Sequence, residues 1–329
     1  MASPFVLDVR QLKKYFPARR PLAEALQGRP AQMVKAVDGV TFSVARGEVL
    51  ALVGESGCGK TTIAKTLIGL ETPTEGEILF DGQAIAGAAA LKQLRARAQM
   101  VFQDPYESLN PRATIFEIVA EPLEVHGLAR GQRERAMRVK GALEDAGLRP
   151  AEDYFLRYPH ELSGGQRQRV VIASAMVLRP ELLIADEPVS MLDVSVRAEI
   201  LNLLRELRQT RGISLVFITH DLSTVAYFAD RIAVMYLGRI VEMGPTRSVL
   251  DQPQHPYTQA LLSAIPVSNP RARRPHIVLQ GETPNPIHVP EGCRFHPRCP
   301  VAQERCKAVD PQLTTVGGNH HAACVLIGP

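Results

Sequence analysis

The chain has 329 residues, of which 45% are hydrophobic and 22% charged, and its formal net charge at pH 7 is +4. This composition predicts a globular protein with one large core or two smaller ones. Because Lys and Arg are interleaved with Asp and Glu, the mild positive charge does not indicate nucleic-acid binding. The longest apolar run, 170–178, is shorter than the roughly 20 residues that span a bilayer, and the start MASPFVLDVR lacks the pattern of a secretory signal. We therefore expect a cytosolic chain without a membrane segment.

Two extended runs, 6–9 and 40–44, open the chain and are separated by a segment rich in Pro, Arg and Ala. They predict an antiparallel strand layer. From residue 49 onward, short apolar runs alternate with longer segments of helical periodicity. This alternation predicts an α/β core, in which helices flank a parallel sheet.

The first motif is GESGCGKT, 54–61, which follows an apolar strand at 49–53 and precedes a helix with Ile63, Leu67 and Leu70 at helical spacing. This context indicates a phosphate-binding loop rather than a plain glycine turn. Glycines allow backbone N–H groups to surround phosphate oxygens, and the helix start adds its positive dipole end. We predict that Lys60 reaches the β- and γ-phosphates and that the Thr61 hydroxyl ligates Mg²⁺. The predicted nucleotide contacts in this segment are Gly54, Ser56, Gly57, Cys58, Gly59, Lys60, Thr61 and Thr62, with no catalytic role for Cys58.

Two acidic residues, Asp186 and Glu187, follow the apolar strand 182–185. Ligands of open α/β sheets bind at this end of the strands. Asp186 is suited to hold Mg²⁺, and Glu187 to orient the water that attacks the γ-phosphate. A helix with one apolar stripe is expected from Asp193 to Gly212, followed by a strand at 215–219.

The segment 104–160 is charge-rich and has few strand signals, which predicts an inserted helical subdomain. It is followed by LSGGQ, 162–166, and by a segment, 166–178, that can form a helix. The N-terminus of such a helix can bind an anion. Ser163 is equally suited to cap the helix. Capping is compatible with anion binding, but it does not explain Gly164 and Gly165.

The C-terminal part, from residue 251, is rich in Pro, His, Arg and Cys and predicts no long helices. Its cysteines have the spacing C-x5-C-x6-C-x17-C and are Cys293, Cys299, Cys306 and Cys324. In a cytosolic protein such a cluster favours a metal over disulfides. The spacing leaves zinc and an iron–sulfur cluster open. His320 or His321 can replace a thiolate, and reduced, packed cysteines are a further alternative.

The chain contains GESGCGKT, LSGGQ and an apolar strand that ends in Asp186 and Glu187, with Gln103 between the first two of these motifs and ITHD at 218–221. This set of motifs resembles the ATPase subunit of ABC transporters over nearly the whole chain. VFQDPYESLNPR, ADEPVSMLDVSVRAEILNLL and HPYTQALLSAIP further resemble dipeptide and oligopeptide importers, most closely the second ATPase subunit of a dipeptide system. The resemblance implies a RecA-like P-loop NTPase fold. We expect a core with its β layer at 1–103 and 162–250, a helical subdomain at 104–161 and a cysteine-containing extension at 251–329.

The resemblance also assigns roles to residues. Gln103 senses Mg²⁺ and moves the helical subdomain, and His220 bonds the γ-phosphate. Phe16, or Tyr15 beside it, stacks on adenine. The residues that close over the ATP of an opposing subunit are Ser163, Gly164, Gly165, Gln166 and, in the loop 190–193, Asp193. In that loop Met191 replaces a residue that is usually small. For the four cysteines the resemblance implies a [4Fe–4S] cluster, with Zn²⁺ as the alternative.

The implied activity is ATP hydrolysis that drives import of dipeptides or oligopeptides. The implied partners are a second ABC ATPase subunit, two membrane permease subunits, contacted near 104–107, and an external solute-binding protein. The chain is expected at the cytoplasmic face of the inner membrane, held there by its partners. Nickel or oligosaccharide import is the nearest alternative. A soluble ABC ATPase acting on nucleic acid or ribosomes lacks support, because no fused second half or basic patch is present. A redox sensor or scaffold would not need Glu187 and His220.

Overall fold

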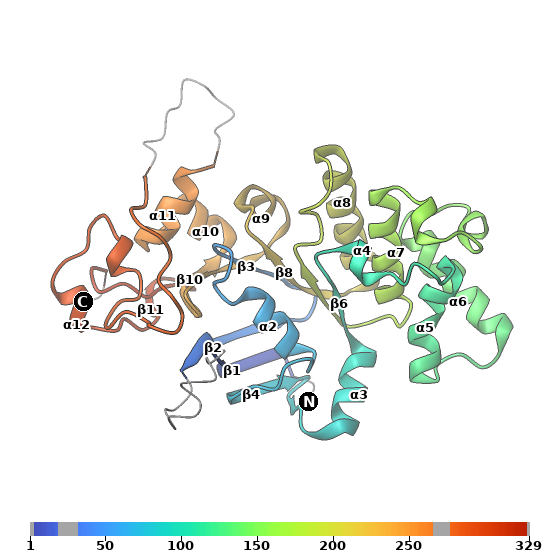
Figure 1. Cartoon of the computed structure of the whole chain (residues 1–329), viewed down its shortest axis with the longest axis horizontal. Helices are drawn as coiled ribbons and strands as arrows, with labels where there is room; N and C mark the ends of the chain where they lie inside the picture. The colour runs from blue at the N-terminus through green and yellow to red at the C-terminus, as the bar shows by residue number, and fades with distance from the viewer. Residues whose placement is uncertain (1–2, 19–31, 266–276, 328–329) are drawn as a thin grey trace, which may run out of the picture. The chain divides into compact units, whose positions relative to one another are not determined.

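The computed structural model describes residues 3–18, 32–265 and 277–327 (Figure 1). It forms two compact units, each built from segments that are distant in the sequence. Unit 1 consists of Met1–Leu7, Val44–Val49 and Leu79–Ile218, and unit 2 of Asp8–Ser43, Leu50–Ile78 and Thr219–Pro329. These units group residues by contacts in space, so the division into core, helical subdomain and extension stays a prediction.

The sheet of unit 1 is parallel. Its strands β6 (Ala98–Val101), β7 (Leu182–Asp186) and β8 (Ser214–Thr219) pair in the order β6-β7-β8. Every residue of β7 and β8 is buried. This burial explains why both strands are continuous apolar runs, since parallel strands are covered on both faces. The predicted α/β core is confirmed.

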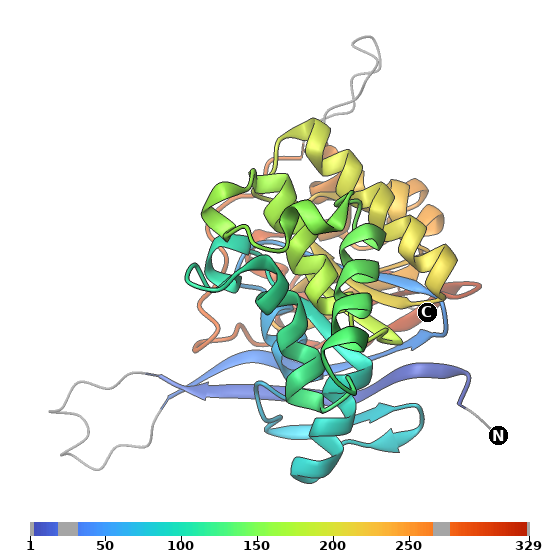
Figure 2. The same ribbon diagram turned by 90° about the vertical axis from the view of Figure 1, so that its right-hand side faces the viewer.

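The helices of unit 1 include those of the segment that was predicted to form a helical subdomain. Its elements are α4 (Pro105–Ser108), α5 (Ile115–His126), α6 (Gln132–Asp145) and the 3-10 turns Ala151–Tyr154 and Pro159–Glu161. The helix after LSGGQ, α7 (Gly164–Met176), packs against α5 and α6, and Figure 2 shows these three green helices side by side. The remaining helices are α3 (Gly87–Arg97) and α8 (Val194–Arg211). Helix α8 begins after Asp193 and ends at Gly212, as predicted.

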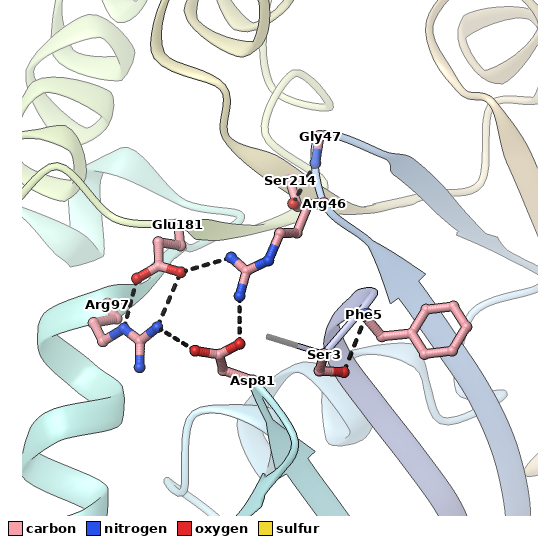
Figure 3. A network of polar contacts seen from close by, with 8 residues as sticks. All are labelled: Ser3, Phe5, Arg46, Gly47, Asp81, Arg97, Glu181 and Ser214. Carbon is pink, nitrogen blue, oxygen red and sulfur yellow. Dashed lines mark hydrogen bonds and ion pairs between the residues drawn. The ribbon is translucent and has the colours of Figure 1, made fainter. Parts of the chain in front are cut away.

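A ring of alternating charges joins four segments of unit 1 (Figure 3). The Arg97 guanidinium donates to Glu181 at 2.6 Å and to Asp81 at 3.0 Å, and Arg46 bonds Glu181 at 3.0 Å and also Asp81. Hydrogen bonds from Arg97 are the main cause that lowers the pKa of both carboxyl groups. Because every member is partly exposed, the ring orients these segments more than it stabilises the fold.

Unit 2 contains the strand that leads into the phosphate loop. This strand, β3 (Val49–Val53), is fully buried and pairs in parallel with β9 (Arg231–Tyr236). Beyond β9, the strands β10 (Arg239–Pro245), β12 (His320–Ala322) and β11 (Thr314–Gly317) add antiparallel pairs. Residues near the C-terminus therefore extend the same sheet as β3, which the sequence did not predict.

The N-terminal strands are longer than the predicted runs. They are β1 (Phe5–Pro17), β2 (Met33–Ala45) and β4 (Glu75–Phe80), in the order β2-β1-β4, and β5 (Gln83–Ala84) pairs with β4 in antiparallel fashion. The predicted antiparallel layer is confirmed. Most of the segment predicted to connect the first two strands, 19–31, lies outside the described residues.

The helices of unit 2 are short. They are α2 (Lys60–Leu67), α9 (Leu222–Phe228), α10 (Thr246–Asp251), α11 (Pro256–Ser263), α12 (Arg305–Ala308) and the 3-10 turn His296–Arg298. Leu70 lies beyond the end of α2 and is 51% exposed, so its assignment to the apolar face of that helix was wrong. No helix in the described ranges combines the length and apolar character needed to cross a membrane.

Three aromatic rings tie the C-terminal part of unit 2 to its sheet. Tyr236 ends β9, Tyr257 lies on α11 and Phe295 precedes the 3-10 turn. Their ring centroids are 4.8 to 5.4 Å apart, and the three side chains are at most 1% exposed. Such close aromatic contacts add to the stabilisation from buried apolar area.

A fully buried carboxylate, Glu242 on β10, lies among donors from the C-terminal part. It accepts hydrogen bonds from the backbone N–H groups of Gln254, at 2.7 Å, and His255, at 3.0 Å. The Nε2 atom of His320 on β12 lies 2.7 Å from the same carboxylate. Burial of a carboxylate is tolerated when it is paired in this way.

Candidate functional site

The glycines of the phosphate loop are required by their backbone angles and by close contacts with neighbouring strands. Gly57 and Gly59 have φ angles of 78° and 108°, which disfavour other residues. A Cβ atom on Gly54 would lie 2.3 Å from the Met235 carbonyl oxygen, and one on Gly59 would lie 2.2 Å from the Ala36 carbonyl oxygen. The two outer glycines are therefore required by close contact with neighbouring strands, whereas sequence reasoning assigned them only to the approach of phosphate.

Lys60 is oriented within this loop. Its side chain is buried, and Nζ donates to the carbonyl oxygens of Gly54, at 2.7 Å, and Glu55, at 3.0 Å. Helix α2 starts at Lys60, and no side chain caps its N-terminus. The loop thus places a cation and the positive end of a helix at one point, which is the arrangement of an anion site.

The remaining predicted residues of the loop differ in exposure. Ser56, Gly57 and Thr61 are exposed and Thr62 is partly buried. Cys58 is 2% exposed, and burial raises the pKa of its thiol. A buried thiol with a raised pKa is a poor nucleophile, and the lack of a catalytic role for Cys58 stays a prediction.

In unit 1 the structure brings two predicted catalytic residues together. Gln103 follows β6 and Glu187 follows β7, and the Gln103 Nε2 donates to Glu187 Oε2 at 3.4 Å. Asp186, the last residue of β7, is 3% exposed. Pairing of β6 with β7 aligns their carboxyl ends, so residues 84 positions apart meet.

The backbone of Glu187 adopts an uncommon conformation. Its φ angle is 48°, in the left-handed region. It is held there by its N–H bond to the Ile218 carbonyl, at 2.9 Å, and by the backbone and hydroxyl of Ser190, which both donate to the Glu187 carbonyl. Such strained residues cluster at functional sites, because the surrounding structure maintains them. Nothing in the sequence predicted this conformation of Glu187.

The loop that continues from Ser190 is open at its tip. Met191 is 58% exposed, Val194 is 80% exposed and Asp193 is also exposed. The long side chain at position 191 therefore meets no steric conflict within the described chain. The role of Asp193 toward an opposing subunit stays a prediction.

The LSGGQ segment begins α7 with a capping box. Ser163 Oγ accepts from the Gln166 N–H at 3.3 Å, and Gln166 Oε1 accepts from the Ser163 N–H at 3.0 Å. The capping role considered for Ser163 is confirmed. A Cβ on Gly165 would lie 2.6 Å from Cγ1 of Val196 on α8, whereas one on Gly164 would make only ordinary contact. Close packing of α7 and α8 therefore explains Gly165, which capping alone did not.

His220 lies in unit 2, directly after β8, and is exposed. The next residue, Asp221, caps α9 by accepting from the Ser223 N–H at 2.9 Å. Although burial acts in the opposite direction, hydrogen bonds from Ser223 and Thr224 lower the pKa of Asp221. The cap fixes the backbone immediately after His220 and leaves its imidazole at the surface.

The two aromatic candidates near the end of β1 have different surroundings. The Tyr15 hydroxyl donates to Asp38, and burial together with this carboxylate raises the Tyr15 pKa. The Phe16 ring is partly exposed and lies 4.7 Å from the Lys14 ammonium. Tyr15 is therefore committed to a contact within the fold, and Phe16 remains the better candidate for stacking on adenine.

The four C-terminal cysteines form no disulfide, and Cys293 interacts with each of the other three in unit 2. Cys293 and Cys306 belong to the hydrophobic core, and the Cys293 N–H donates to the Cys306 carbonyl at 2.9 Å. Burial, with a smaller contribution from the other three cysteines, raises the pKa of Cys293 to about 11. Backbone N–H groups lie 3.4 Å from the sulfur atoms of Cys306 and Cys324.

These thiols do not form a metal site as they stand. Within 3–18, 32–265 and 277–327, no three His, Cys, Asp or Glu side chains are arranged to hold a metal ion. His320 is bonded to Glu242, and His321 Nδ1 lies 3.1 Å from the Asn319 carbonyl oxygen. The donor chemistry suits a thiolate-bound metal. The arrangement also agrees with reduced, packed cysteines.

One residue of the phosphate loop that sequence reasoning missed is Glu55. Its carboxylate is paired with Arg298 at 2.7 Å and accepts from the Thr283 hydroxyl at 2.8 Å. Its N–H donates to the Tyr257 hydroxyl at 2.9 Å. The signal available in the sequence was its charge, since a carboxylate is electrostatically unfavourable in a loop that binds phosphate.

Two family profiles match the chain. The profile "ABC transporter" matches residues 37–190, and the profile "Oligopeptide/dipeptide transporter, C-terminal region" matches residues 241–306. The oligopeptide transport ATP-binding protein AppF of Bacillus subtilis is 49% identical over 98% of this chain and 97% of its own length. The di/tripeptide transport ATP-binding protein DppF of Pseudomonas aeruginosa is 46% identical over 96% of this chain and 98% of its own length.

Solved structures have the same fold. CbiO1 of Clostridium perfringens, described as part of the ABC transporter complex cbiONQ, is 30% identical with a TM-score of 0.65, covering 76% of this chain and 92% of its own. The ATP-binding cassette MJ0796, in a dimeric post-hydrolysis state with ADP and Pi, is 29% identical with a TM-score of 0.63. The match covers 73% of this chain and 99% of the MJ0796 chain. With its phosphate loop, its LSGGQ helix and the paired Gln103 and Glu187, this chain belongs to the ABC ATPases, in the family of oligopeptide and dipeptide transport ATP-binding proteins.

Proposed function

We propose that this chain hydrolyses ATP to drive the import of dipeptides or oligopeptides across a membrane. The observation that carries this proposal is the match of residues 241–306 to the C-terminal region of oligopeptide and dipeptide transporters, because the ATPase motifs alone serve many solutes. It is supported by relatives of nearly equal length whose names specify oligopeptide or di/tripeptide transport.

The nucleotide site uses the residues described above in distinct roles. Lys60 and the N–H groups at the start of α2 bind the phosphates, and Phe16 stacks on adenine. Thr61, Gln103 and Asp186 are the residues that would hold Mg²⁺, which neutralises phosphate charge when bound. Glu187 orients and polarises the attacking water, and its backbone conformation fixes the direction of its carboxylate. His220 completes the set by bonding the γ-phosphate.

The chain acts as one of a pair. In this proposal the residues that close over the ATP of a second ABC ATPase subunit are Ser163, Gly164, Gly165, Gln166 and Asp193. The exposed Met191 and Val194 at the tip of the neighbouring loop are available to such a subunit. The dimeric state described for MJ0796 supports this arrangement.

The surface that contacts the permease subunits begins at α4. Tyr106 on this helix is 61% exposed, with the Arg167 guanidinium 4.3 Å from its ring centroid. Helix α4 starts two residues after Gln103, so a shift of Gln103 toward the nucleotide moves this surface. Two permease subunits would hold the chain at the cytoplasmic face of the inner membrane, and an external solute-binding protein would deliver peptide to them.

Uptake of a labelled dipeptide tests this function. In a strain that lacks this chain and all redundant peptide systems, the wild type is expected to restore uptake and Glu187→Gln to leave it absent. Glu206→Gln, a matching change on the exposed side of α8, should restore uptake as the wild type does. If the deletion leaves the uptake of both a labelled dipeptide and a labelled oligopeptide unchanged, peptide import is ruled out. Nickel and oligosaccharide uptake would then be measured in the same strains.

For the four cysteines we propose a [4Fe–4S] cluster, with Zn²⁺ as the alternative. The proposal is supported by four thiols gathered in one part of unit 2 and by N–H groups near two of the sulfur atoms. Binding would require the side chains to move from their described positions. Anaerobic purification followed by iron, sulfide and zinc analysis is expected to give iron with matching sulfide, and Cys299→Ser is expected to lose both. Zinc without iron, or neither metal, would refute the cluster.

A further inference from the structure

Residues of the C-terminal part of the chain bind the carboxylate of Glu55. Arg298 binds it with both terminal nitrogens, Nη1 at 2.7 Å from Oε2 and Nη2 at 3.2 Å from Oε1, and the Thr283 hydroxyl adds a third bond. The Arg298 side chain is only 9% exposed, whereas that of Glu55 is 29% exposed. This is the two-pronged geometry in which arginine pairs most strongly with carboxylate.

The backbone of Glu55 is held from two directions. Its N–H donates to the hydroxyl of Tyr257, from α11, and its carbonyl oxygen accepts from Lys60 Nζ at 3.0 Å. The same residue thus contacts the C-terminal part and the lysine predicted to bind phosphate. A displacement of Glu55 would therefore be transmitted to the Lys60 ammonium.

Arg298 itself is firmly supported. Its backbone N–H bonds the Phe295 carbonyl at 3.0 Å, and its guanidinium lies 5.9 Å from the Tyr236 ring centroid. Phe295 and Tyr236 belong to the buried aromatic contacts of unit 2. The Arg298 guanidinium is therefore already ordered before nucleotide binds, so nucleotide binding does not have to supply the free energy of ordering it.

The charge of Glu55 shows what this arrangement does. An uncompensated carboxylate beside a phosphate-binding loop repels the phosphates, and the repulsion is stronger where water is partly excluded. Arg298 cancels this charge. We propose that Arg298, together with the contacts that Tyr257 and Thr283 make to Glu55, is a positioning residue for nucleotide binding. It neutralises Glu55 and holds the phosphate loop in its anion-binding form. This inference concerns ATP affinity and does not depend on which solute is carried.

The test measures the Kd of fluorescent ATP and ADP analogues for the purified full chain. Arg298→Ala is expected to raise the Kd for ATP about tenfold, because it leaves one negative charge near the phosphates. The increase should be smaller for ADP, and it should shrink at high salt. The decisive variant is Arg298→Ala combined with Glu55→Gln, which removes both charges and should recover most of the lost affinity. Lys307→Ala, which breaks the exposed ion pair of Lys307 with Glu304, should leave the Kd for ATP and for ADP unchanged.

Two outcomes would overturn the proposal: an unchanged Kd in Arg298→Ala, or a double variant that binds no better than Arg298→Ala alone. If Arg298→Ala does not fold, Arg298→Lys decides instead. Lysine keeps the charge without the two-pronged contact, so ATP affinity should stay within about threefold of the wild type. A folded Lys variant with a tenfold loss would contradict neutralisation. None of these outcomes bears on peptide uptake, which is tested separately.

Discussion

Replacing Glu187 with Gln is expected to lower the kcat for ATP hydrolysis by about a hundredfold or more while ATP still binds. The amide cannot accept a proton from the attacking water, but it has the same shape and its oxygen can still accept the bond from Gln103. The residues predicted to bind the phosphates lie elsewhere in the chain and are unchanged. The kcat and the Kd for ATP, measured on the same preparation, check the two halves of this prediction.

Glu206→Gln provides the matched control, since it removes an exposed carboxylate from α8. It should hydrolyse ATP at the wild-type rate. A Glu187→Gln variant that retains most of its turnover would assign the water-orienting role to another residue. A variant that lost ATP binding instead would show that Glu187 contributes to the ground state rather than to hydrolysis.

Replacing Gly59 with Ala is expected to lower the free energy of unfolding by about 3 kcal/mol and to abolish nucleotide binding. Alanine is disfavoured at a φ of 108°, and its Cβ would lie 2.2 Å from the Ala36 carbonyl oxygen, so β2 or the loop has to shift. Urea denaturation measures the first effect, and titration with a fluorescent ATP analogue measures the second.

Gly57→Ala separates backbone strain from steric conflict. Gly57 also has a positive φ, 78°, but nothing lies within 4 Å of a Cβ added there. Gly57→Ala should lower the free energy of unfolding by only about 1 kcal/mol. Equal losses of stability in the two variants would show that the contact with Ala36 is not what requires glycine at position 59.

The sequence predicted those parts of the fold that depend on local patterns. The ends of helix α8 were predicted correctly because Asp193 and Gly212 are recognisable end signals. Strands β3 and β7 were predicted because buried parallel strands are uninterrupted apolar runs. The pairing of β12 with β10 could not be predicted. His320 and His321 carry no strand pattern, and their partners lie about 80 positions earlier in the chain. Strand pairing over such distances is determined by tertiary contacts.

The candidate site shows the same division. The sequence motifs identified the candidate site residues by their type and spacing. Gln103 and Glu187 meet because β6 and β7 are neighbouring parallel strands of the predicted sheet. The strained backbone of Glu187 could not be predicted, because glutamate has no preference for that conformation. Neither could the contacts of Glu55, since Arg298 and Thr283 are separated from it by more than 200 residues and belong to no motif.

The buried position of Glu242 limits where this chain can be divided. A shortened protein that ended after β10 would keep the carboxylate but lose the N–H groups of Gln254 and His255 and the imidazole of His320. The side chain would then either be left inside the protein without donors or turn outward to water, which would disrupt the strand that carries it. We therefore expect β10 to be destabilised in such a protein. Fusions, chimaeras and crystallisation fragments of this chain have to retain its last strands for β10 to fold.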